Sequence, residues 1–129
     1  MKNNILKLII YLYYLSLTIL LILYLFPGSL IGYLFYGDFD KQPNFIDNPI
    51  GTSINHFFYF FYLTSLGLIY NSKEKKVVNS FLFFLILSFT LELSHFFVRN
   101  RAFEFYDIIS NTLGVLIAYL CIKLIRKYL

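Results

Sequence analysis

Four long stretches without a single charged side chain run through this chain of 129 residues. They cover residues 8–26, 48–72, 77–91 and 108–122, and they are rich in Leu, Ile, Phe and Tyr. A helix needs about 20 apolar residues to cross the hydrocarbon core of a bilayer, so these stretches predict membrane-spanning helices. Charged residues make up only 14% of the chain, against roughly 25% in a typical soluble domain, which excludes an ordinary soluble protein.

Helix-breaking residues and short polar turns separate the predicted spans. Pro27 and Gly28 end the first one, because proline cannot continue a helix and glycine favours a turn. We predict that residues 27–53 form an outer loop. Within it, the segment 30–36 is too short to cross the membrane and is expected at the level of the lipid headgroups. The sequence thus predicts one all-α domain over residues 1–129, an integral membrane four-helix bundle with spans at about 5–26, 54–70, 77–98 and 106–125. The short turn between the second and third spans makes these two antiparallel neighbours.

A signal peptide is an alternative interpretation of the first span, with Lys2 and Lys7 as its basic region. However, the apolar core is longer than the roughly 7–15 residues that signal peptides use, and no small-x-small cleavage site follows it. We therefore expect an uncleaved helix.

Lysine and arginine residues gather on one side of the predicted membrane. Eight lie at the two termini and in the turn 71–76, whereas the other side has only Lys41, Arg99 and Arg101. The positive-inside rule therefore places both termini in the cytoplasm and turns the loops 27–53 and 99–105 outward. Since the basic residues flank the spans instead of forming one face, the net charge of +4 does not predict nucleic acid as a partner.

Ionisable residues inside the predicted spans are the candidates for function, because each costs roughly 2.5–3.5 kcal/mol to insert into a membrane. They are His56, Glu92 and His95. Glu92 and His95 belong to an i, i+4, i+7, i+11 series on the third span, which lies on one stripe of a helix. The series is Ser88, Glu92, His95 and Arg99.

The fourth span carries a series with the same spacing: Asp107, Asn111, Gly114 and Ala118. The two small residues predict close helix packing deeper in the membrane, below Asp107 and Asn111. His56 starts the second span at the same outer end. The topology therefore predicts one polar pocket at the outer leaflet, formed by the ends of three helices and by Arg101 in the connecting loop.

Each of these residues also has a purely structural interpretation. His56 could be an interfacial histidine, Asp107 a first-turn carboxylate favoured by the helix dipole, and Arg101 a solvated loop residue. Glu92 is the hardest to explain in this way, since a carboxylate inside a span needs a partner or a proton.

The pair of Glu92 and His95 predicts general acid–base chemistry, because a histidine oriented by a carboxylate can move a proton. A zinc site made of His56, His95 and Glu92 is conceivable, but the helical H-E-x-x-H signature is absent and a single E-x-x-H is a weak signal. We accordingly predict no metal and no cofactor.

The order of these motifs resembles the VanZ-like family. Residues 52–119 carry H-F at His56, E-x-x-H at Glu92, an arginine at Arg101, and D-x-x-x-N-x-x-G starting at Asp107. The family pattern has an Asp-Lys pair before the histidine and glutamine at the end of E-x-x-Q. This chain has Thr52, Ser53 and His95 at those three positions.

The resemblance implies a small multi-span protein of the bacterial inner membrane, linked to resistance to glycopeptide antibiotics such as teicoplanin. Our leading hypothesis is a pocket that binds, and could modify, an anionic lipid or peptidoglycan precursor. The candidate catalytic residues are Glu92, His95, His56 and Asp107, and the candidate substrate-binding residues are Arg101 and Asn111.

The alternative hypothesis is non-enzymatic: the polar cluster is structural, and the protein shields or reorganises the envelope surface. A transporter or channel is less favoured, since a translocation path needs polar groups along its length and these lie at one end.

Overall fold

A computed structural model describes residues 2–43, 51–71 and 77–128, and all the regular structure in these ranges is helical. This part of the chain confirms the all-α prediction. The elements are α1 (Lys2–Leu25), α2 (Leu30–Tyr36), α3 (Ser53–Asn71), the single 3₁₀ turn η1 (Val77–Asn79), α4 (Phe81–Ser94) and α5 (Phe105–Tyr128).

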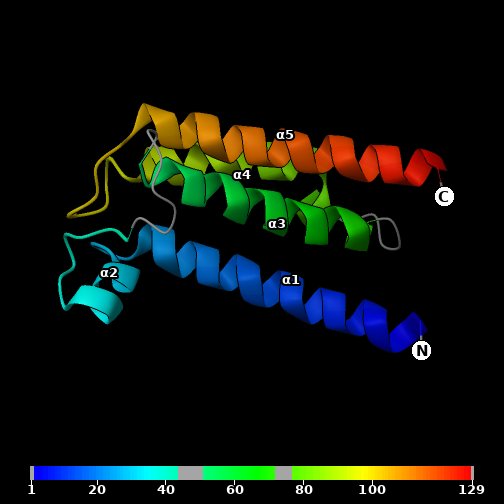
Figure 1. Ribbon diagram of the computed structural model, residues 1–129, viewed down its shortest axis with the longest axis horizontal. Coiled ribbons are helices and arrows are strands. Elements are labelled where there is room, and N and C mark those ends of the chain that lie inside the picture. Colours follow the sequence, from blue (N-terminus) through cyan, green and yellow to red (C-terminus); the bar gives the residue numbers. More distant parts are fainter. Residues whose placement is uncertain (1, 44–50, 72–76, 129) are drawn as a thin grey trace.

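The four longer helices run up and down in alternating directions (Figure 1). Both chain ends lie at one end of the molecule, where α1 begins and α5 finishes. The opposite end brings together the C-terminal ends of α1 and α4, the N-terminal ends of α3 and α5, and the small helix α2. The residues that the sequence predicted at one depth therefore belong to elements that meet at this end.

The closest helix pair is α3 and α5, which touch through backbone atoms at Gly114. A Cβ atom at Gly114 would lie 2.5 Å from the Phe57 carbonyl oxygen and 3.0 Å from the Phe61 nitrogen. Ala118, one turn further along α5, is completely buried. The predicted role of this small-residue face in close packing is confirmed.

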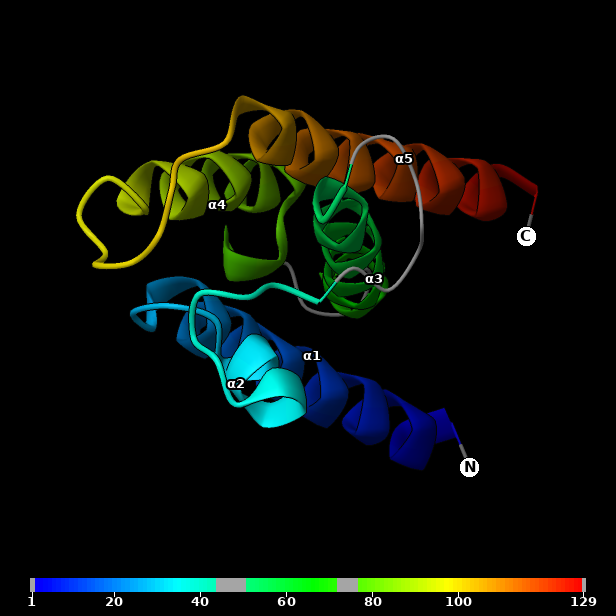
Figure 2. The same cartoon turned by 60° about the vertical axis from the view of Figure 1, so that its left-hand side comes forward.

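Helix α4 is shorter than the predicted span 77–98. It starts after Ser80, whose hydroxyl accepts a hydrogen bond from the Phe83 amide as an N-cap, and it ends at Ser94. The remaining residues of that stretch form η1 and an irregular turn. Figure 2 shows that α4 runs antiparallel to α5, and α5, more than α3, is its main packing partner. The second and third predicted spans are therefore antiparallel but are not close neighbours.

The structure contains a fifth α-helix within the predicted outer loop. Ser29 caps the start of α2 by accepting a hydrogen bond from the Gly32 amide, and Gly37 ends it in the left-handed conformation with φ 69°. Leu34 and Phe35 on this helix are 79% and 67% exposed, which is consistent with contact with an apolar phase.

Two of the described helices are long and apolar enough to cross a membrane, Asn4–Leu25 and Phe105–Tyr128. Most of their apolar residues are not covered by protein, as Leu8 and Leu120 illustrate with exposures of 57% and 54%. The first helix is nevertheless part of the fold, since its residues Tyr13 and Leu20 are buried in the core.

Candidate functional site

The predicted site residues come together at the end of the bundle where α2 lies. His56 is on the first turn of α3, Glu92 and His95 are at the C-terminal end of α4, and Asp107 and Asn111 are on the first turns of α5. Glu92, His95, Asp107 and Asn111 are buried, and His56 is partly buried.

Arg99 is the exception to the predicted stripe on the third span. Because α4 ends at Ser94, Arg99 is not on the helical face of Glu92, and its side chain is exposed. The placement of Arg99 beside the other polar residues was wrong for this reason.

Glu92 connects α4 to the start of α5. Its Oε1 atom lies 3.1 Å from Nδ1 of His95 and also accepts a hydrogen bond of 3.1 Å from the backbone amide of Glu104. The second carboxylate oxygen, Oε2, is buried without a hydrogen-bond partner in the described structure, and so is Nε2 of His95. Glu92 therefore orients the His95 ring and leaves the far nitrogen of that ring free for another contact.

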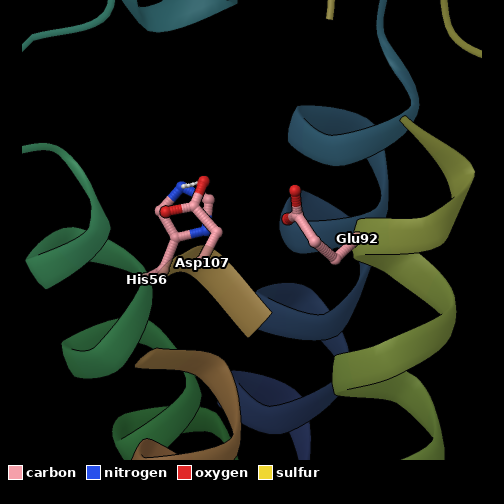
Figure 3. Close-up of side chains that lie close together, drawn as sticks. All are labelled: His56, Glu92 and Asp107. Carbon is pink, nitrogen blue, oxygen red and sulfur yellow. Dashed lines mark ion pairs between the residues drawn. The ribbon is translucent and has the colours of Figure 1, made fainter. Parts of the chain in front are cut away.

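His56 and Asp107 form a second pair, between α3 and α5 (Figure 3). His56 Nε2 lies 3.6 Å from Asp107 Oδ2, which is an ion-pair distance but is too long for a hydrogen bond. Asp107 Oδ1 has no hydrogen-bond partner in the described structure.

Tyr24, near the end of α1, is the site residue that the sequence analysis missed. Its hydroxyl lies 2.6 Å from His56 Nδ1 and donates a hydrogen bond of 3.1 Å to Asn111 Oδ1. Its ring stacks on the His95 ring with centroids 5.2 Å apart. The available signal was the i, i+7, i+11 spacing of Tyr13, Leu20 and Tyr24, which puts the hydroxyl on the buried face of the first span.

Arg101 reaches back from the loop after α4 toward α1. Its guanidinium donates a hydrogen bond to the Leu23 carbonyl, while its buried Nε has no partner in the described structure. Burial lowers the pKa of Arg101 from its usual value, against the opposing influence of Tyr24, Glu92 and Asp107, but a guanidinium stays charged in proteins. In the same loop, Glu104 is exposed but partly desolvated, which raises its pKa, and the charges of Asp107 and Glu92 raise it further.

A cavity of about 110 Å³ lies between the ends of α1 and α3 and the segment that carries α2. It is smaller than the roughly 150 Å³ cavity that can hold a benzene molecule, so it suits a group of about phosphate size rather than a whole lipid. Its polar lining includes one arginine and two histidines; the polar side chains are Tyr24, Ser29, Gln42, Asn55, His56, Tyr59, His95 and Arg101. Glu92, Asp107 and Asn111 lie behind this lining.

Three side chains could hold a metal ion, and they differ from the set considered from the sequence. They are His56, Glu92 and Asp107, each with one ligand-type atom within 4.8 Å of the others. His95 is not in this set.

The family model described as VanZ/LLP1 matches residues 7–126, which includes nearly all of the four longer helices. The chain belongs to the VanZ/LLP1 family. No curated protein and no solved structure matches it. The resemblance drawn from the sequence motifs is thus confirmed at the level of the family.

The motif positions of this VanZ/LLP1 chain lie together in space, including two of the three that depart from the family pattern. His95, in the place of the family glutamine, still bonds to Glu92. Ser53, in the place of the family lysine, is buried at the N-terminus of α3, three residues before His56.

Proposed function

We propose that this VanZ/LLP1 protein spans the bacterial inner membrane and binds the anionic headgroup of a lipid or cell-wall precursor in the cavity beside Arg101. The observation that carries the proposal is the position of a partly buried guanidinium in the wall of a cavity of phosphate size. A planar guanidinium suits phosphate and carboxylate groups, which it can hold through two parallel hydrogen bonds.

The membrane arrangement that we propose uses all four longer helices as spans. The exposed apolar side chains along α1 and α5 and the alternating directions of the helices support it. In the sequence, eight basic residues lie near the two termini and in the segment 71–76, and three lie in the loops of the other side, which supports termini that face the cytoplasm. The cavity then opens at the outer leaflet, at the level of the headgroups.

The proposed chemistry is proton transfer by His95 to or from the bound group. Glu92 accepts the Nδ1 proton of His95, which leaves Nε2 to act as the base, and the ring of His95 lines the cavity. Asn111 fixes the Tyr24 hydroxyl, which in turn fixes His56. The link to teicoplanin resistance that the family resemblance implies fits a change at the envelope surface, and it is part of this proposal.

Binding is tested with Arg101→Gln, and Arg99→Gln is the matched control, because Arg99 is exposed and lies two residues away. The full chain is purified in mild detergent and loaded with mixed phosphatidylglycerol and phosphatidylcholine, and the retained lipid is quantified by mass spectrometry. We expect the wild type and Arg99→Gln to retain phosphatidylglycerol preferentially and Arg101→Gln to lose that preference. Equal retention by all three proteins would remove Arg101 from the binding site.

Chemistry is tested in cells that express the wild type, Glu92→Gln or His95→Gln at matched membrane abundance. We expect the abundance of at least one lipid or cell-wall precursor to change in cells that express the wild type, and to stay unchanged in cells that express either variant. Teicoplanin susceptibility should follow the same pattern. If no species differs while susceptibility still shifts, the protein acts by binding and not by catalysis.

A structural role for the polar cluster is the second candidate, because its side chains bond to one another across helices. Glu92 holds the start of α5 through the Glu104 amide, and Tyr24 joins α1 to α3 and α5. Under this proposal a single substitution in the cluster lowers thermal stability in detergent, since breaking a buried pair is strongly destabilising. A catalytic residue instead loses activity and leaves stability unchanged or higher.

A further inference from the structure

Three helices each direct one metal-binding type of side chain to a common point. His56 from α3, Glu92 from α4 and Asp107 from α5 have ligand-type atoms that all lie within 4.8 Å of one another. Figure 3 shows the imidazole and the Asp107 carboxylate side by side, with the Glu92 carboxylate facing them from α4. Glu92 is fully buried, and Asp107 is only 3% exposed.

The hydrogen bonds around Tyr24 decide where the His56 ring carries its proton. The Tyr24 hydroxyl has one proton, which it donates to Asn111 Oδ1. Toward His56 Nδ1, 2.6 Å away, the hydroxyl can therefore only accept, so Nδ1 carries the proton. The lone pair of the neutral ring is then on Nε2, which faces Asp107 Oδ2 at 3.6 Å.

This arrangement places several electron-rich atoms together with no cation in direct contact, and Arg101 acts on the two carboxylates only from a longer distance. Glu92 Oε2 and Asp107 Oδ1 are both buried without a hydrogen-bond partner in the described structure. Among the residues of ranges 2–43, 51–71 and 77–128, no lysine or arginine forms an ion pair with either carboxylate. Buried charges in proteins are normally paired or coordinate a metal.

We propose that His56 Nε2, Glu92 and Asp107 bind a divalent transition metal of the Zn²⁺ class. One imidazole with two carboxylates suits zinc, since magnesium and calcium prefer oxygen ligands alone. At ligand distances of about 2.0–2.1 Å a tetrahedral site needs donor atoms about 3.3 Å apart, so no pair of ligand atoms has to close by more than about 1.5 Å on binding. Three protein ligands leave one position for water or a ligand from outside.

Tyr24 completes the site as a positioning residue. Metal-binding histidines usually donate their other ring N–H to a neighbouring acceptor, which fixes the tautomer and the ring orientation. The Tyr24 hydroxyl accepts this hydrogen bond, and Asn111 fixes the hydroxyl in turn. This inference does not depend on the binding of an anionic headgroup in the cavity.

The site is tested with Zn²⁺ alone on the full chain, purified in detergent and first stripped with a chelator. Competition with a chromophoric chelator measures stoichiometry and affinity. We expect one zinc per chain in the wild type and an affinity roughly 100-fold or more lower in His56→Gln and Asp107→Asn, beyond the 10–100-fold effect of outer-shell changes. Asp40→Asn, which removes an exposed carboxylate outside the site, is the matched control and should bind one zinc with unchanged affinity. Failure of the wild type to bind zinc, or unchanged binding in Asp107→Asn, would overturn the proposal.

A measurement on the wild type alone avoids dependence on variants that fail to fold. X-ray absorption at the zinc edge should show one imidazole, with oxygen for the remaining ligands. Two imidazoles would mean that His95 joins the site and would overturn the ligand set. Tyr24→Phe should keep the one-imidazole spectrum while its zinc affinity falls by roughly 10–100-fold, an effect that a change in packing alone would not produce. Phosphatidylglycerol retention, measured with the chelator present, keeps this result separate from the binding proposal above.

Discussion

The Tyr24 hydroxyl lies 2.6 Å from Nδ1 of His56 and ties the end of α1 to the start of α3. The same hydroxyl bonds to Asn111 on α5, so one oxygen atom connects three helices. Because these groups lie in the interior of the bundle, removal of the hydroxyl leaves both the imidazole and the amide without this partner.

Tyr24→Phe is therefore expected to lower the free energy of unfolding by about 1–3 kcal/mol, the cost of leaving buried polar groups unpaired. Thermal unfolding in detergent, without added metal, measures the change. Tyr11→Phe is the control on the same helix, since Tyr11 is 73% exposed, and it should have almost no effect. Equal stability of the two variants would show that the hydroxyl of Tyr24 does not hold the helices together.

Gly114→Ala is expected to separate α3 from α5. The new methyl group would meet backbone atoms of α3, which cannot rotate away as a side chain would, so we expect a loss of about 3 kcal/mol. The neighbouring substitution Leu113→Ala removes a side chain that is 44% exposed and should cost no more than about 0.5 kcal/mol. Comparison of their unfolding temperatures in the same detergent distinguishes backbone contact from a general effect of mutating α5.

Glu92→Gln and Glu92→Leu distinguish the hydrogen bonds of this side chain from its charge. Glutamine keeps an oxygen that can accept from the Glu104 amide and from His95, so we expect its stability to stay within about 1 kcal/mol of the wild type. Leucine cannot accept either hydrogen bond and should be about 2–3 kcal/mol less stable. If Glu92→Gln is as unstable as Glu92→Leu, the negative charge of the carboxylate, and not its hydrogen bonds, holds the α4–α5 connection.

Glu104→Gln is expected to make stability less dependent on pH. Partial desolvation, and then the charges of Asp107 and Glu92, raise the pKa of Glu104 in the folded protein. The folded state therefore binds the Glu104 proton more readily than the unfolded state, and this contribution to stability is complete below the ordinary glutamate pKa and is lost as the pH rises through the raised value. At neutral pH the variant should be slightly more stable than the wild type, and the difference should vanish under acidic conditions. Unfolding curves across this pH range measure it, and a difference that grows on acidification would contradict the sign.

The apolar runs were enough to predict the four longer helices, because each run is longer than a typical strand. The series from Asp107 to Ala118 was predicted well, since α5 is continuous through it. The series on the third span failed at Arg99 because α4 ends at Ser94, and helical spacing has no meaning beyond a helix end. The helix α2 was signalled by Ser29 and Gly37, which fit the capping rules on either side of residues 30–36.

The helical spacing of residues in the sequence could not predict which side chains of different helices contact one another in the site. The spacing placed His56 and Asp107 at one depth, but the rotation of each helix decides whether they face each other. The contribution of Tyr24 required the docking of α1, which no motif in the sequence specifies. For the same reason, only the three-dimensional structure shows that Asp107, and not His95, completes the metal-binding set.

Helix α4 has 14 residues and is about 21 Å long, whereas the hydrocarbon core of a bilayer is about 30 Å thick. In the membrane arrangement proposed above, a helix this short would create a hydrophobic mismatch on its side of the bundle, which a bilayer relieves by local thinning. The turn after Ser94 exposes Phe96 and Phe97, two aromatic rings suited to the interface, next to the site. Thinning of the outer leaflet at α4 would lower the lipid headgroups toward Glu92 and His95, so that the membrane itself would help to deliver a polar ligand to the site.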